Sequence, residues 1–464
     1  MELPSQSSSA EDPFLPHEHA SGLPVVSCNR WWVLLLYTAY SSLQCAAWAT
    51  PGALQPQYMA EYSFSQNTMQ LLLNYGCFGN IVFMLPSMWV LDRAGLRVPI
   101  MACMAMTAAS AVMRLFATDA STRSLVLIHA SCILNAVAGP LATGCPSKLA
   151  EDWFPPHERT LACGIAAMAA QGGAAIVYLM LPLLSPNGDA AGMARIHGAS
   201  AGIGVALLAL ALAHFPSLPP QAPSASSRVS REHWQGEKIT LASLGASSWR
   251  FFSAPGYSVC VLTYAFTGGL STCQSGLLTQ NLMQVGATEA QAGWVGTVSL
   301  LGGVAAGVVA ARLGDALKAR YAWGLKALLC ASALGGALAF TVFAASTQLG
   351  WGGFPLACAA FCASQMFLSA QICLTFEVAA EAAWGLGPEG SMLILLVTPA
   401  NVVNLVGFLL PQAIFFPVAN WGTAAVALCS IPALLQWVPN ASRRLQFDLE
   451  SIGSGKKEQL LLQA

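Results

Sequence analysis

The sequence predicts an all-α membrane protein with twelve transmembrane helices in two bundles of six. The chain of 464 residues is 55% hydrophobic and only 9% charged. Apolar blocks recur at intervals of about 30 residues, and each is close to the ~20 residues that a spanning helix needs. One polar stretch separates the sixth block from the seventh. Because a soluble domain carries about 25% charged residues, the composition excludes an ordinary soluble globule.

The apolar blocks define the expected domain organisation. The first six cover 31–54, 68–91, 97–117, 124–147, 160–184 and 196–214, and the second six cover 256–282, 289–312, 322–345, 351–376, 391–416 and 420–438. The stretch between them is rich in Pro and Ser, which is typical of a flexible linker. We therefore expect a disordered N-terminal tail at 1–29, bundles at 30–215 and 251–439, a cytosolic linker at 216–250 and a C-terminal tail at 440–464.

Charge placement supports this arrangement. If both termini face the cytosol, only Arg114, Arg123 and Arg195 of the 20 Lys and Arg residues fall on the far side of the membrane. This asymmetry follows the positive-inside rule and favours an even number of spans. The net charge of -1 provides no field that would attract nucleic acid. The expected partners are the lipid bilayer and a small-molecule substrate, and the oligomeric state is not predicted.

The cysteines and the N-terminus provide little evidence for other chemistry. The 14 cysteines are scattered singly along apolar stretches, so we interpret them as packing residues and expect no metal site or cofactor. Residues 1–24 lack the basic start and apolar run of a cleavable signal, so the first span is expected to direct insertion. No arrangement of nucleophile, base and acid is apparent, and the chain is not expected to be an enzyme.

Two similar segments follow the second and the eighth block. Residues 91–97 and 311–318 each place an Asp at a cytosolic span end with a cation close behind. Such a carboxylate can cap a neighbouring helix N-terminus and pair with the cation, which would form a latch between the bundles; the alternative is a solvated turn. Glu377 and Glu381 share a helix face and are expected to meet cations in the same gate or to form a solvated edge. The predicted gate residues are Asp92, Arg93, Arg97, Arg159, Asp315, Lys318, Glu377 and Glu381.

Two groups of six spans with these segments resemble the major facilitator superfamily. Within it, three stretches resemble the feline leukaemia virus subgroup C receptor-related transporters, also called solute carrier family 49. These stretches are Arg30–Leu36 leading to Trp48, Trp153-Phe154-Pro155-Pro156-His157-Glu158-Arg159, and Phe376–Glu381 followed by Pro388-Glu389-Gly390. Residues 128–140 and 292–296 most resemble the "disrupted in renal carcinoma" branch. The resemblance implies the major facilitator fold. It also implies a pyridoxine-like substrate, or a choline- or ethanolamine-like one as in other branches.

The same resemblance suggests a substrate site at mid-depth. In the choline-transporting branch, a first-span Trp and amides of the fifth and eleventh spans line the pocket; Trp48, Gln171 and Asn401 fall on these positions. Thr272 replaces the aromatic residue of the seventh span, which weakens a cation cage. A neutral polar ring that stacks on Trp48 and bonds to Gln171, Gln274 and Asn401 would fit better. The alternative for each residue is packing or a helix–helix hydrogen bond.

The expected mechanism is alternating access with facilitated diffusion. No acidic residue falls at mid-depth, where a carboxylate is costly and usually functional. His129 is the only histidine that we expect inside a span; it is either a proton-sensitive group or a structural one. The alternatives are a proton-coupled solute or haem transporter and a non-transporting receptor or scaffold. The expected location is an endolysosomal or vacuolar membrane or the plasma membrane. Residues 458–462 indicate either a sorting signal or an amphipathic tail.

Overall fold

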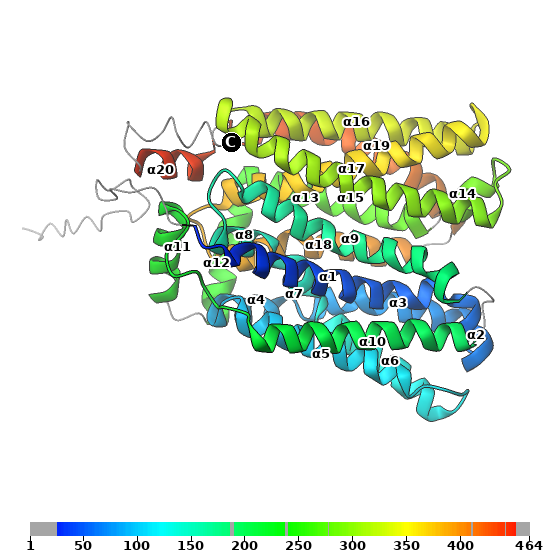
Figure 1. Cartoon of the computed structure of the whole chain (residues 1–464). Coiled ribbons are helices and arrows are strands. Elements are labelled where there is room, and N and C mark those ends of the chain that lie inside the picture. Colours follow the sequence, from blue (N-terminus) through cyan, green and yellow to red (C-terminus); the bar gives the residue numbers. More distant parts are fainter. Residues whose placement is uncertain are drawn as a thin grey trace, which may run out of the picture.

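A computed structural model describes residues 26–185, 190–236, 240–276, 278–409, 412–440 and 442–451 of the chain. In this part of the chain the secondary structure consists of helices, most of which run roughly parallel as long rods (Figure 1). The predicted sorting signal and most of the predicted N-terminal tail lie outside the described residues.

The helices fall into two groups along the chain. The first comprises α1 (Asn29–Ala53), α2 (Gln55–Tyr62), α3 (Gln66–Val82), α4 (Met84–Ala94), α5 (Arg97–Leu115), α6 (Thr122–Val137), α7 (Gly139–Gly144), α8 (Pro146–Trp153), α9 (Arg159–Leu184) and α10 (Ala190–Ala213). The second comprises α13 (Pro255–Gly276), α14 (Leu278–Met283), α15 (Glu289–Arg320), α16 (Gly324–Gln348), α17 (Gly353–Ala383), α18 (Glu389–Leu409) and α19 (Gln412–Trp437). Between and after them lie α11 (Ala225–Gly236), α12 (Leu241–Ser253) and α20 (Arg443–Ser451).

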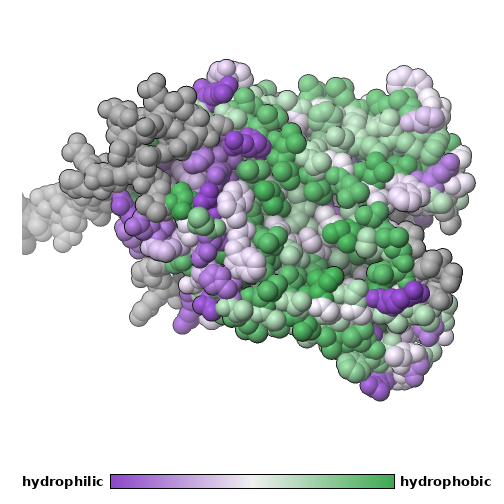
Figure 2. Space-filling view, viewed as in Figure 1, coloured by the Kyte–Doolittle hydropathy of each residue, from purple (hydrophilic) through white to green (hydrophobic). Residues whose placement is uncertain are grey.

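These helices account for the twelve predicted spans. Eight helical segments of the described chain are long and apolar enough to cross a membrane, and α3 with α4 forms a further span that bends by 55°. Helices α1, α13 and α19 occupy the three remaining predicted positions. The bend at Phe83 lies three residues before Pro86, which has no N–H to donate to the preceding turn. Apolar side chains cover the middle of the face seen in Figure 2, whereas polar ones gather where α11 and α20 lie.

The linker is more ordered than its composition predicts. It contains α11 and α12, so the prediction of a flexible segment is wrong for these residues. A carboxylate oxygen of Asp448 accepts a hydrogen bond of 2.7 Å from the backbone N–H of Ser226, which caps the first turn of α11. Thr240 and Ser243 form a capping box at the start of α12. A hydrogen bond to a distant part of the chain therefore helps to fix α11 in a segment that contains no long apolar block.

Two helices of the second group extend beyond their predicted ends. The apolar blocks stop at 312 and 376, yet α15 continues to Arg320 and α17 to Ala383. The charged residues that follow those blocks therefore lie on continuous helices and not in loops. Helix α9 of the first bundle packs against α15 and α17, and α18 packs against α3, α4 and α7. A Cβ atom at Gly164 would stand 2.4 Å from the Cβ of Ala311, so small residues allow the bundles to approach closely there.

Candidate functional site

The two ends of the bundles differ, and we name them by their short helices. Helices α8, α11, α12 and α20 lie at one end, called here the α20 end, and α2 and α14 lie at the other (Figure 1). All eight predicted gate residues belong to the α20 end.

Asp315 joins the two bundles at the α20 end. Its side chain is completely buried near the end of α15. Its two carboxylate oxygens accept hydrogen bonds from the backbone N–H groups of Thr160 (3.1 Å) and Leu161 (2.8 Å), in the first turn of α9. The Nζ of Lys318 lies 2.9 Å from the same carboxylate and donates to the Thr160 hydroxyl at 2.7 Å. A carboxylate of the second bundle thus stabilises the positive N-terminus of a helix in the first.

Asp92, the corresponding residue of the first bundle, is placed in the same way. Its carboxylate accepts a hydrogen bond from the Ser391 hydroxyl, in the first turn of α18. A Cβ atom at Gly390 would stand 2.5 Å from the Asp92 carboxylate, so the glycine permits this approach. Each Asp therefore meets the N-terminus of a helix in the opposite bundle. These are the contacts that a latch requires, and the role of the two residues in transport stays a prediction.

The two arginines that follow Asp92 do not pair with it. Arg93 and Arg97 are exposed, and Arg93 lies over the ring of Trp89 at 5.1 Å. Within the described ranges no ion pair involves either arginine, so the expected pairing with Asp92 is wrong. The reason is geometric, because consecutive residues on an α-helix point about 100° apart. Asp92 faces α18, and the next residue therefore points away from it.

Glu377 and Glu381 meet cations from two different elements. Lys318 Nζ lies 2.9 Å from Glu377, and the guanidinium of Arg444 lies 3.5 Å from Glu377 and 3.8 Å from Glu381. Arg444 also pairs with Glu389 at the start of α18 and is only 1% exposed. The repulsion expected between the two i, i+4 carboxylates is therefore offset by two buried cations.

Arg159 connects the first bundle to the linker and to α20. Its guanidinium donates to the hydroxyl groups of Ser224 (2.8 Å) and Ser227 (3.2 Å) and lies 3.6 Å from the Asp448 carboxylate. Asp448 in turn caps α11 through Ser226. Because Arg444 of the same short helix binds the second bundle, α20 bridges both bundles and the linker.

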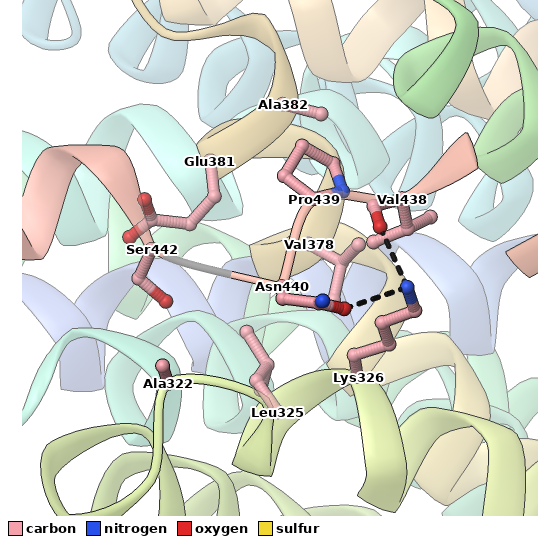
Figure 3. A pocket seen from close by; sticks show the side chains of 10 residues that line it. All are labelled: Ala322, Leu325, Lys326, Val378, Glu381, Ala382, Val438, Pro439, Asn440 and Ser442. Atoms are coloured by element: carbon pink, nitrogen blue, oxygen red, sulfur yellow. Dashed lines mark hydrogen bonds between the residues drawn. The ribbon is translucent and has the colours of Figure 1, made fainter. Parts of the chain in front are cut away.

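The path of the chain into α20 is also fixed. Figure 3 shows a small hollow between the end of α19 and α17, with Lys326 on one side and Glu381 on the other. The Nζ of Lys326 donates to the carbonyl of Val438 (2.8 Å) and to the side-chain oxygen of Asn440 (2.9 Å). A cation at a helix C-terminus is favourable, so Lys326 stabilises the end of α19 just before α20 begins.

A further charged group lies on α8, outside the spans. Lys148 Nζ is 3.2 Å from Glu151 and 3.0 Å from Asp152. Burial disfavours the charged form of Lys148, but the two carboxylates outweigh it and raise the pKa of the ammonium above its usual value. Burial would raise the pKa of Glu151, but Lys148 and Arg444 hold it below its usual range. Lys148 and Glu151 therefore stay ionised at neutral pH.

Sequence reasoning missed Arg444, Asp448, Glu389 and Ser391. The first two lie in a short polar tail, where composition predicts a solvated segment. Their i, i+4 spacing places them on one face of α20, and this is the only local signal that they share a surface. Glu389 is part of the Pro388-Glu389-Gly390 motif and Ser391 follows it, but their contacts depend on how the bundles meet.

Of the residues predicted to line the substrate site, Trp48 and Gln171 are both half-buried and hydrogen-bonded. The indole N–H of Trp48 donates to the Leu73 carbonyl at 2.9 Å. A Cβ atom at Gly76 would stand 2.5 Å from the indole nitrogen, so the indole packs directly on α3. The side-chain oxygen of Gln171 accepts a hydrogen bond of 2.9 Å from Ser369 on α17, across the two bundles.

The other three predicted site residues are bonded within the second bundle. Thr272 is exposed and donates to the Gly268 carbonyl of its own helix. Gln274 is completely buried and donates to the Ala419 carbonyl (2.9 Å). This is a hydrogen bond between helices, which is the alternative to a substrate contact. Asn401 donates to Val397, one turn earlier, and not to the carbonyl that Pro399 leaves free. In the described part of the chain no hydrogen bond joins any of the five to another, so the shared site stays a prediction.

The histidines correct one expectation. His129 lies in α6 with its Nδ1 3.0 Å from the Tyr75 hydroxyl. His197 also lies inside a span, α10, where it is 3% exposed and its Nε2 is 2.9 Å from the Tyr58 hydroxyl. The expectation of a single histidine inside a span is therefore wrong. His197 stands two residues after Arg195, at the start of its apolar block, so the sequence does not reveal how deeply it is buried.

The two helical bundles meet through charged contacts at the α20 end and through amide contacts farther along the helices. The sequence matches the profile of the Major Facilitator Superfamily over residues 36–378. It is 30% identical over 386 residues to the solute carrier family 49 member 4 homolog of Xenopus tropicalis, which covers 79% of this chain and 81% of the relative. The chain therefore belongs to the major facilitator superfamily and, within it, to solute carrier family 49.

More distant relatives and solved structures agree. The choline/ethanolamine transporter FLVCR2 of Homo sapiens is 25% identical over 290 residues, which cover 61% of this chain and 54% of that protein. The proton:xylose symporter XylE superposes with a TM-score of 0.70 at 12% identity, over 91% of this chain and 99% of XylE. The E. coli fucose:proton symporter FucP gives a TM-score of 0.65 at 14% identity, over 88% of this chain and 98% of FucP. At these identities, the solved structures establish the fold alone.

Proposed function

We propose that this transporter moves a small polar organic solute by facilitated diffusion, with the α20 end as its cytosolic gate. One observation carries the proposal: Asp92 and Asp315 each contact the N-terminus of a helix in the opposite bundle. Rocking of two bundles around a mid-membrane site is the usual mode of such folds. For the α20 end to open, both contacts must break.

The substrate class follows from the charge distribution. Seven carboxylates of the described residues are buried, and all lie at the α20 end; they are Glu151, Asp152, Asp315, Glu377, Glu381, Glu389 and Asp448. A solute held at mid-depth would therefore meet amides, hydroxyls and the indole of Trp48. Such groups suit a neutral polar ring such as pyridoxine best. An amine such as ethanolamine is the second candidate. The relative named as a choline/ethanolamine transporter supports the same range of solutes.

The location of the protein is part of the proposal. The positive-inside distribution supports cytosolic termini. The resemblance to the "disrupted in renal carcinoma" branch favours an endolysosomal or vacuolar membrane over the plasma membrane.

Uptake into proteoliposomes tests the function. Labelled pyridoxine, ethanolamine and choline are offered with and without a proton gradient. We expect pyridoxine to equilibrate without accumulating, and the gradient to have no effect. Accumulation driven by the gradient would establish a proton-coupled transporter instead. If none of the three moves while the purified protein is folded, the substrate assignment is wrong and the receptor or scaffold alternative gains support.

A further inference from the structure

Three carboxamides form a cluster at mid-depth of the first bundle that the predicted site does not include. Gln44 on α1 and Asn135 on α6 bond reciprocally, because each side-chain NH₂ donates to the other residue's backbone carbonyl at 3.1 Å. Asn80 on α3 donates to the Gly76 carbonyl at 3.0 Å. A Cβ atom at Gly139 would stand 3.1 Å from the Asn80 amide and 3.7 Å from that of Gln44, so these two side chains lie beside the same glycine, and Gln44 connects Asn80 to Asn135.

The carboxamide oxygens are available as acceptors. Asn135 is 2% exposed and Asn80 is 8% exposed. The side-chain oxygen of each is buried and has no hydrogen-bond partner among the described residues. Buried polar atoms are almost always paired, because an unmade hydrogen bond costs free energy. Two such acceptors in one cluster indicate a position suited to the donors of a ligand.

The helix is interrupted near the cluster in both neighbouring spans, by a sharp bend between α3 and α4 and by a single residue, Ala138, between α6 and α7. Asn80 lies three residues before Phe83, where α3 and α4 meet at 55°. Asn135 lies just before the break between α6 and α7, where Gly139 is followed by Pro140. Discontinuous helices near the bilayer midplane are where transporters of this kind bind their substrates.

The cluster lies beside the indole of Trp48 and the boundary between the bundles. Gln44 lies one turn before Trp48 on α1, and Gly76, which touches the indole, lies one turn before Asn80 on α3. Cys77, which follows Gly76, accepts a hydrogen bond of 3.2 Å from the side-chain NH₂ of Asn404 on α18 of the second bundle. The acceptors, the aromatic ring and the inter-bundle contact thus occupy one region.

We infer that Asn80 and Asn135 form a hydrogen-bond subsite that selects solutes carrying at least two donors, hydroxyl or N–H. This inference deepens the proposed function and rests on it. The two side-chain oxygens accept the donors while the ring or head of the solute lies near Trp48. Pyridoxine and ethanolamine supply several donors, whereas choline has a single hydroxyl and a methylated nitrogen. Choline is therefore expected to be the poorest of the three solutes.

Substitution of the two asparagines tests the subsite. Asn80→Leu and Asn135→Leu remove the acceptors and should each raise the KM for pyridoxine by about fivefold to tenfold, as for the loss of one hydrogen bond. Asn80→Asp and Asn135→Asp keep the shape and add a negative charge, so they should shift the preference from pyridoxine toward ethanolamine. Binding of the same solutes to purified protein, measured by thermal shift, should follow the uptake.

Asn74 provides a matched control on the same helix. Its side-chain NH₂ donates to Gln70 at 3.0 Å and its buried oxygen is also unpaired, but it lies about 240° around α3 from Asn80. Asn74→Leu should leave the KM unchanged. If the wild type transports but the Asp variants keep its KM and its preference, the amides are structural and the subsite is wrong, even if the Leu variants fold poorly. If the wild type neither binds nor transports any of the three, the proposed function itself fails.

Discussion

The α20 end and the middle of the bundles are held together by different chemistry. At the α20 end, buried carboxylates meet Lys318, Arg159 and Arg444 and the N-termini of α9 and α18. At mid-depth, the contacts between bundles are neutral, such as Gln171 with Ser369 and Asn404 with Cys77. Ions at a membrane edge can regain water when their contacts break, whereas a charge at mid-depth cannot. We therefore propose that opening and closing take place at the α20 end and that the middle of the bundles recognises the solute.

Removal of Arg444 should have the largest effect on closure of the α20 end. Arg444→Ala leaves Glu377, Glu381 and Glu389 without their shared cation, and breaking a buried pair costs about 3–5 kcal/mol. We expect α20 to leave the bundles and the reaction of the buried Cys163 and Cys373 with N-ethylmaleimide to accelerate about a hundredfold or more. Mass spectrometry of the labelled peptides measures the rates.

Arg443→Ala is the matched control for Arg444→Ala. Arg443 is exposed and lies next to Arg444 at the start of α20. Its variant should label at the wild-type rate. Equal acceleration in both variants would mean that α20 does not hold the α20 end closed through Arg444.

The two aspartates should differ in a predictable order. Asp315→Asn loses a charged cap and leaves Lys318 with fewer partners. Cysteine labelling should therefore accelerate by about tenfold to a hundredfold, as for a charge-assisted bond worth roughly 1.5–3 kcal/mol. Asp92→Asn should have a smaller effect, because no cation pairs with Asp92 in the described chain. The reverse order would contradict the assignment of the ion pairs as the main closing contacts.

A change at mid-depth should alter recognition and leave closure intact. Trp48→Ala should raise the KM for pyridoxine by about threefold to tenfold, as for the loss of an aromatic contact worth roughly 0.5–1.5 kcal/mol. Gln171→Ala should act in the same direction, and uptake kinetics measure both. Neither variant should change the labelling of Cys163 at the α20 end. If either accelerates it as Arg444→Ala does, the two regions are not separate.

The smallest effect is expected at Arg93. It is exposed, and its ring contact with Trp89 is worth at most about 1 kcal/mol. Arg93→Ala should therefore change cysteine labelling by less than about twofold. A large effect would show that Arg93 acts in the latch even though its side chain points away from Asp92.

The sequence predicted the fold well because the apolar blocks are long and periodic. It also predicted that Asp92 and Asp315 would lie at helix ends, since both follow similar span ends. It did not predict α11 or α20, because polar tails fold here only through buried contacts such as Arg159 with Asp448. The cluster of Gln44, Asn80 and Asn135 was missed for a related reason. An isolated amide in an apolar block does not reveal which helix it will bond.

The central claim is that the two bundles must separate at the α20 end during each transport cycle. Cysteines placed at Asp92 and Ser391, which touch across the bundles, allow a direct test by disulfide cross-linking. The account predicts that oxidation of this double variant stops pyridoxine uptake and that reduction restores it, while each single variant is unaffected by oxidation. Undiminished uptake by the fully cross-linked protein would contradict the account.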